Sequence, residues 1–127
     1  MKLRIKANSI RLRFSKTELA SLVAGQPLEE AVRFSAQPDG QLIYTLTPAR
    51  SDSEKVVEFT GSRLSVSLSA EQIATLSGSN EIGIYTSVAI GLDEVLEIMV
   101  EKDFACLDGT DEDNRDTFAH PLSGAVC

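Results

Sequence analysis

Ser9-Ile-Arg-Leu-Arg-Phe-Ser-Lys-Thr-Glu-Leu-Ala-Ser-Leu22 is the stretch from which the architecture of this chain can be worked out. Its first part alternates apolar residues with arginines, which is the period of a half-buried strand. Ser15 and Glu18 then have the spacing of a capping box, in which each side chain binds a backbone N–H at the start of a helix. The stretch therefore predicts a strand over 9–14 that leads directly into a helix over 16–24.

The same pattern returns 54 positions further on, where the alternation falls on residues 64–68 and Ser69 and Gln72 repeat the capping pair. The match extends without a gap from residues 2–47 onto residues 56–101. We interpret the chain as two strand-strand-helix-strand-strand repeats, each too small to bury its own sheet face alone. The expected fold is α+β: a single domain at 1–109 with a mainly antiparallel, barrel-like eight-stranded sheet and two short helices.

The expected elements follow the alternation and the breaks in it. Strands are predicted over 2–6, 9–14, 29–34, 42–47, 56–59, 64–68, 81–87 and 95–100, and helices over 16–24 and 70–76. A linker is expected at 48–53, and residues 110–127 form an acidic, partly ordered tail. The predicted core consists of Leu3, Ile5, Ile10, Leu12, Phe14, Leu19, Leu22, Val32, Phe34, Leu42, Tyr44, Val57, Phe59, Leu64, Val66, Leu68, Ile73, Leu76, Ile82, Ile84, Leu96, Ile98 and Val100.

Composition narrows the class of protein. The formal net charge of -7 argues against a nucleic-acid partner, because attraction to phosphates is the main sequence-independent term in such binding. The chain has no apolar run as long as a signal peptide or a membrane helix, so we expect a cytoplasmic protein with no membrane partner. Two cysteines are too few for a disulfide scaffold, and reduced thiols are expected.

Charge is unevenly distributed along the chain. Six of the twelve cations lie in the first sixteen residues, and ten of the nineteen acids lie between Asp93 and Asp116. Opposite charges favour pairing of neighbouring strands. We therefore expect strand 95–100 beside one of the first two strands, with Glu97 or Glu101 near the N-terminal arginines. Phe104 and Leu107 would cover this seam, and the sheet would close toward a barrel.

The basic side chains of the first two strands form the main candidate site. Arg4, Lys6, Arg11 and Arg13 are expected on one sheet face, where guanidinium groups can bind a carboxylate or phosphate in a bidentate way. The alternative is a solvated outer face, or pairing of these cations with Glu97 and Glu101.

Two metal hypotheses are weaker. Cys106, His120 and Cys127 supply thiolate and imidazole ligands, but their spacing matches no known site. Glu97, Glu101 and Asp103 would hold a divalent cation only if other carboxylates converged on them. No cofactor is predicted.

Two end signatures resemble a small family of uncharacterised bacterial proteins. They are Lys2-Leu-Arg-Ile-Lys-Ala-Asn-Ser-Ile-Arg-Leu-Arg13 and Val100-Glu-Lys-Asp-Phe-Ala-Cys-Leu-Asp108. The resemblance covers nearly the whole chain and implies no activity. A weaker likeness is to the triphosphate tunnel enzymes, whose closed eight-stranded barrel is similar to two fused repeats of this type. Their first strand carries Glu-x-Glu-x-Lys, whereas here Lys2, Arg4 and Lys6 occupy that strand.

The sequence favours a small non-enzymatic binding or interaction protein, because the motifs of catalysis are absent. The alternative is an enzyme or carrier that binds a phosphorylated or carboxylated small molecule through its basic strand face. The expected partner is accordingly an unknown protein or a small anionic ligand. The chain is expected to be a monomer or weak homodimer.

Overall fold

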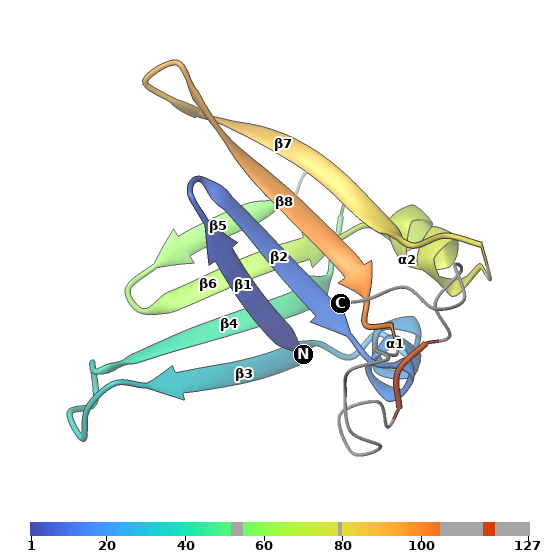
Figure 1. Cartoon of the computed structure of the whole chain (residues 1–127), viewed down its shortest axis with the longest axis horizontal. Coiled ribbons are helices and arrows are strands. Elements are labelled where there is room, and N and C mark those ends of the chain that lie inside the picture. Colours follow the sequence, from blue (N-terminus) through green and yellow to red (C-terminus); the bar gives the residue numbers. More distant parts are fainter. Residues whose placement is uncertain (52–54, 79, 105–115, 119–127) are drawn as a thin grey trace.

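The computed structural model describes residues 1–51, 55–78, 80–104 and 116–118. It contains eight strands and two helices in these residues (Figure 1). In chain order they are β1 (Lys2–Lys6), β2 (Ser9–Phe14), α1 (Lys16–Val23), β3 (Leu28–Arg33), β4 (Gln41–Pro48), β5 (Val57–Thr60), β6 (Arg63–Leu68), α2 (Ala70–Ser77), β7 (Gly83–Gly91) and β8 (Glu94–Lys102).

The strands form two separate four-stranded sheets. Sheet A has the order β1-β2-β8-β7 and sheet B has the order β3-β4-β6-β5. In each sheet the two central strands are parallel and the outer pairs are antiparallel. The α+β class and the repeat are confirmed. The single barrel-like sheet is wrong, because β1, β7, β3 and β5 remain edge strands and neither sheet closes.

The register of the strands follows the repeat. Ser9 pairs with Glu97 across the parallel seam of sheet A, and Arg63 pairs with Ile43 across that of sheet B. Ser9 and Arg63 are 54 positions apart, and so are Ile43 and Glu97. Each sheet therefore combines the first hairpin of one repeat with the second hairpin of the other.

The gapless match fails at one strand. Leu28 of β3 pairs with Leu46, whereas Ile84 of β7 pairs with Val100. Leu46 and Val100 keep the spacing of 54, but Leu28 corresponds to Ile84 and no longer to Ile82. Two extra residues between the end of α2 and Ile84 cause the shift, and a shorter turn between β7 and β8 cancels it.

Both predicted capping boxes are present. The Glu18 N–H donates to Ser15 Oγ at 3.2 Å, and the Ser15 N–H donates to Glu18 Oε1 at 2.9 Å. Ser69 and Gln72 make the same pair of bonds at the start of α2. Each helix consequently starts immediately after the strand that precedes it, and both helices lie at the same end of the two sheets (Figure 1).

The core lies between the inner faces of the two sheets and is covered at one end by the helices. Its buried side chains come from β2, β3, β4, β6 and β8 and from both helices. They are Ile10, Leu12, Phe14, Leu22, Leu28, Tyr44, Leu46, Val66, Leu68, Ile73, Leu76, Ile98 and Val100. Leu28 and Leu46 were missing from the predicted core.

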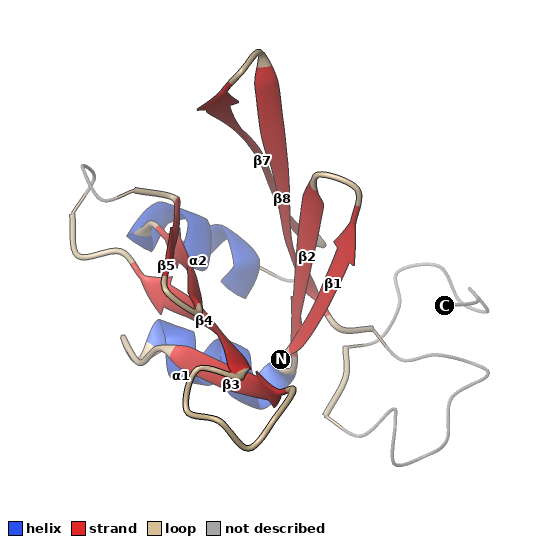
Figure 2. Ribbon diagram, turned by 90° about the vertical axis from the view of Figure 1, so that its left-hand side faces the viewer, coloured by secondary structure: helices blue, strands red, loops and turns tan. Residues whose placement is uncertain are grey.

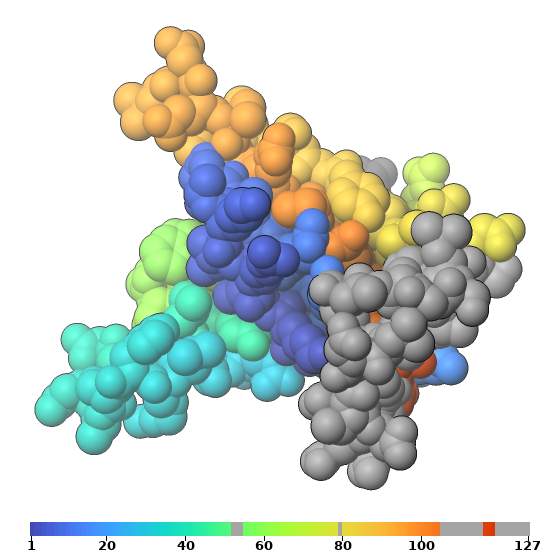
Figure 3. Space-filling view, viewed as in Figure 1, coloured from blue at the N-terminus to red at the C-terminus, as the bar shows by residue number. Residues whose placement is uncertain are grey.

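Five predicted core residues are exposed: Ile5, Val32, Phe34, Phe59 and Ile82. Phe34 and Phe59 are 73% and 66% exposed. The strand faces were assigned correctly for Ile5 and Phe59, since they pair with Ile10 and Leu64. Distance from the opposite sheet explains the exposure of residues near the hairpin tips: the hairpin tips of sheet A stand away from sheet B (Figure 2), and the β7–β8 tip and the β3–β4 turn project from the body (Figure 3).

The predicted junction between the ends of the chain is confirmed. β8 lies beside β2, and Glu101 forms an ion pair with Arg11. Beyond β8, Phe104 forms a bridge with Phe118, whose ring packs edge-on against Phe14. Leu107 and most of the predicted tail at 110–127 lie outside the described residues.

Candidate functional site

The outer face of sheet A carries the predicted basic side chains. Alternation places them opposite to the buried residues of β2, and the register sets Arg4 beside Arg11 and Lys2 beside Arg13. In an antiparallel pair such directly opposed side chains are close neighbours. The four predicted cations Arg4, Lys6, Arg11 and Arg13 therefore do share one face, as the alternation indicated.

Glu101 neutralises part of this face. Its Oε1 lies 2.7 Å from Arg11 Nε and 3.9 Å from Arg13 Nε, and its side chain is only 13% exposed. The Tyr85 hydroxyl donates to Glu101 Oε2 at 2.8 Å. Burial, together with this hydrogen bond, raises the pKa of Tyr85 to about 12. The carboxylate thus holds three side chains from two neighbouring strands.

A small hollow of about 120 Å³ lies further along the same face. It is lined by Arg4, Lys6, Ser9, Arg11 and Met99. Neither Arg4 nor Lys6 forms an ion pair with any carboxylate among the described residues. The Arg11 guanidinium reaches this hollow through Nη2, which lies 3.5 Å from the sulfur of Met99. Three of the four predicted cations therefore surround one hollow.

Arg13 lies outside this hollow. The register places it between Lys2 and Glu101. Lys2 Nζ is 2.8 Å from Asp103 Oδ2, so the charges at this end of the face are paired internally. Pairing with Glu101 was one of the alternatives to an anion site on this basic face. It accounts for the charge of Arg13 and for the Nε side of the Arg11 guanidinium.

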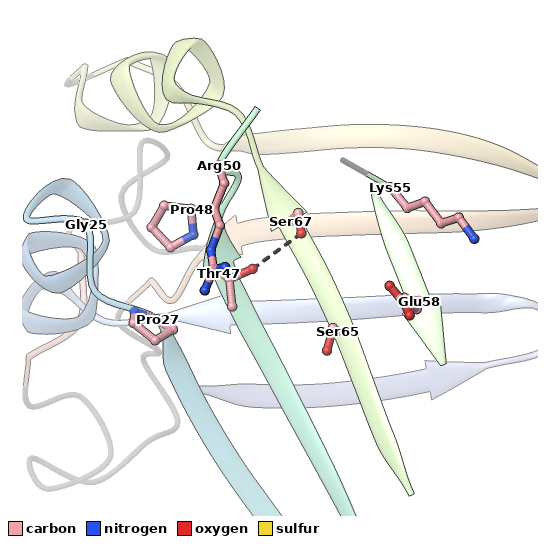
Figure 4. Close-up of a pocket in the computed structure, with 9 residues that line it drawn as sticks. All are labelled: Gly25, Pro27, Thr47, Pro48, Arg50, Lys55, Glu58, Ser65 and Ser67. Carbon is pink, nitrogen blue, oxygen red and sulfur yellow. Dashed lines mark hydrogen bonds between the residues drawn. The ribbon is translucent and has the colours of Figure 1, made fainter. Parts of the chain in front are cut away.

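The outer face of sheet B has a pocket of about 350 Å³ at positions that the repeat relates to the basic face (Figure 4). The repeat counterparts of Arg11, Arg13 and Glu101 are Ser65, Ser67 and Thr47, and all three line this pocket. The Thr47 and Ser67 hydroxyl oxygens lie 3.3 Å apart and share a hydrogen bond. Short hydroxyl side chains thus leave open the space that ion pairs fill on sheet A.

Charged groups of both signs border the sheet B pocket. Arg50, Lys55 and Glu58 line it together with Gly25, Pro27 and Pro48. Glu58 stands at the repeat position of Arg4, so a carboxylate replaces a cation there. Sequence reasoning missed this pocket. The alternation of serine and threonine on β4 and β6 was its only signal, since it places several hydroxyls on one face.

Only one of the two metal hypotheses falls on described residues. The described residues contain no group of three side chains placed to hold a metal ion. Glu101 pairs with Arg11 and Asp103 pairs with Lys2, so two members of the acidic trio with Glu97 are engaged by cations, and the convergence of carboxylates on which that hypothesis depended is not seen among the described residues. Cys106, His120 and Cys127 lie outside the described residues. None of the helices seen in the described part of the chain has the length and apolar character needed to span a membrane.

The fold defines the class of this protein: an α+β protein of two ββαββ repeats whose hairpins are exchanged between two mixed sheets. The chain belongs to the family of unknown function DUF7009, whose model matches residues 1–122. Comparison with curated proteins and with solved structures gives no match. The likeness to triphosphate tunnel enzymes is not supported, because those enzymes have a closed barrel and these sheets remain open.

Proposed function

We propose that this protein is a non-catalytic binding protein that holds a small anion, a carboxylate or a phosphate group, on the outer face of sheet A. The observation that carries the proposal is the hollow that Arg4, Lys6 and Arg11 line together. Cations that converge on one small space favour an anionic occupant, and arginine adds the geometry for two parallel hydrogen bonds.

Repulsion within the face supports the proposal. Arg4 and Arg11 are direct cross-strand neighbours, and like charges in such positions oppose strand pairing. Glu101 offsets the charge of Arg11 and Arg13, but it makes no ion pair with Arg4 or Lys6. An anion bound between Arg4 and Lys6 would reduce the repulsion among the cations that Glu101 does not offset.

The pocket on sheet B is a weaker candidate for the same ligand. Glu58 replaces Arg4 at the corresponding position, and its carboxylate repels an anion. The two faces therefore provide a comparison within one molecule. An anion should bind on sheet A and leave the hydroxyl-lined pocket of sheet B unaffected.

Thermal-shift and calorimetric titrations with sodium phosphate and sodium acetate test the proposal at constant ionic strength. A ligand present at a hundred times its Kd adds about 2.7 kcal/mol of stability. The variant that combines Arg4→Gln and Lys6→Gln should lose this stabilisation, and Lys55→Gln on the sheet B pocket is the matched control. Equal stabilisation of the wild type and the double variant would refute the site. Absence of any stabilisation in the wild type would refute binding of both probes.

A further inference from the structure

Lys102 is an unusual feature of the core. It is the last residue of β8 and is only 5% exposed, although lysine is rarely buried without a charged partner. Its Nζ donates to the Gly78 carbonyl oxygen at 2.8 Å and lies 5.3 Å from the centre of the Phe118 ring. Both contacts suit a cation at the C-terminal end of α2.

These contacts do not use all the donors of the ammonium group. An ammonium carries three N–H donors, and the described residues accept one hydrogen bond from it. Burial disfavours the charged form and lowers the pKa of Lys102. The repeat does not require a lysine here, because Pro48 is the counterpart on sheet B.

A pocket lies beside Lys102. Its volume is about 530 Å³, and it lies where the ends of β8 and α2 meet α1. Half of its lining residues are apolar: Leu19, Leu76, Ile82, Phe104 and Phe118. Its polar lining residues are Ser77, Gly78, Asn80, Glu81 and Lys102. A cation set among apolar and aromatic groups complements a molecule with one anionic group and an apolar body.

We propose that this pocket binds a monocarboxylate with an apolar body, whose carboxylate accepts a hydrogen bond from Lys102 and whose body packs against Leu76 and Phe104. The ligand carboxylate would accept hydrogen bonds from the N–H donors of the buried Lys102 ammonium that the Gly78 carbonyl leaves unused. Glu81 is the opposing charge in the lining, and its carboxylate weakens the binding of any anion. The site is separate from the basic face of sheet A, and it takes a larger, amphipathic ligand.

Octanoate and its neutral counterpart octanamide serve as probes, and binding is measured by calorimetry on the full chain. Octanoate should bind at least tenfold more tightly than octanamide. Lys102→Met keeps the apolar stem and removes the charge, and it should reduce octanoate affinity at least tenfold. Equal affinity for the two probes, or unchanged binding by Lys102→Met, would overturn the proposal.

A second variant keeps the test decisive if Lys102→Met does not fold. Glu81 is exposed, so Glu81→Gln should leave the fold intact and increase octanoate affinity severalfold. An unchanged or reduced affinity in Glu81→Gln contradicts the proposed location. The double variant of Arg4→Gln and Lys6→Gln lacks the carboxylate site proposed on sheet A, and octanoate binding that depends on Lys102 should persist in it. Loss of octanoate binding there would assign the ligand to sheet A and refute the Lys102 site.

Discussion

Among single residues, Glu101 has the widest influence on the outer face of sheet A. It pairs with Arg11 and Arg13 and accepts the Tyr85 hydroxyl, while its own side chain is largely covered. Glu101→Gln keeps the shape but leaves two arginines without their carboxylate. We expect a loss of about 1–3 kcal/mol in the free energy of unfolding, measured by urea denaturation. A loss no larger than that of an exposed control such as Glu94→Gln would show that these pairs are unimportant.

The same variant should change the titration of Tyr85. In the wild type the folded-state pKa of about 12 lies above the ordinary tyrosine value of 10.0, so the contribution of Tyr85 to stability is complete below pH 10 and is lost between pH 10 and 12. In Glu101→Gln the phenolate should form at lower pH. Ultraviolet absorbance follows this titration, and Tyr85→Phe identifies its signal against Tyr44. An unshifted midpoint would contradict the assigned hydrogen bond.

Asp116 acts at the opposite end of the pH scale. The Lys16 N–H donates to its carbonyl oxygen, and the Thr17 N–H donates to its Oδ1, so it contributes to the start of α1. Hydrogen bonds from the Thr17 and Ser15 side chains help to lower the pKa of Asp116 below 3.8. Asp116→Ala should therefore reduce Tm at neutral pH. The difference in Tm should narrow as pH falls below 3.8, because the wild-type carboxylate then becomes protonated.

At the scale of elements, the two capping boxes are equivalent in sequence and in geometry. Ser15→Ala and Ser69→Ala should each cost about 1 kcal/mol of stability, because each leaves a first-turn N–H without its side-chain acceptor. Urea unfolding of the two variants measures both losses. Thr75→Ala, at an exposed position of α2 away from its cap, serves as a control. A loss at only one of the two serines would mean that the helices are not equivalent in stability.

The different burial of two phenylalanines gives a second test at the scale of elements. Phe14 is fully buried, so Phe14→Ala should cost on the order of 3–5 kcal/mol. Phe59 lies on an inner face but is 66% exposed, so Phe59→Ala should cost less than about 1 kcal/mol. Comparable losses at the two positions would indicate that Phe59 is covered in solution.

Local pattern explains why the elements were predictable from sequence. Alternation and capping depend on neighbours within a few residues, so strands such as 9–14 and the starts of both helices follow directly. Alternation also identifies the face of a strand, but it says nothing of how closely the opposite sheet approaches. For Ile5 and Phe59 the predicted strand face was therefore correct, but the predicted burial was wrong.

The same distinction between local pattern and tertiary structure applies to the candidate sites. The basic row was recognisable because its charges alternate on consecutive strands, and the pairing of Glu101 with Arg11 followed from the charge asymmetry of the chain. The pocket around Lys102 was not recognisable. It depends on residues of α1, α2, β8 and the segment at 116–118, which only the tertiary fold brings together.

At the scale of the whole molecule, each sheet needs both halves of the chain. The central strand pairs β2–β8 and β4–β6 each join one repeat to the other. Residues 1–51 and 52–127, produced as separate chains, should therefore each be unfolded, because each half leaves its hairpins without a parallel neighbour. Mixing the two should restore the circular dichroism spectrum of the intact protein. A folded isolated half would contradict this mutual dependence.

The parallel seam between β2 and β8 also has a consequence for synthesis. A ribosome adds about 5–20 residues per second, and residues 9–14 must wait for residues 97–102 before their hydrogen bonds on that side can form. Pairing between segments so distant in sequence is also slow after release, because a long loop must close first. During that interval the apolar side of the first hairpin is accessible to water. The growing chain therefore passes through a period in which a chaperone that covers apolar strands would improve the yield of native protein.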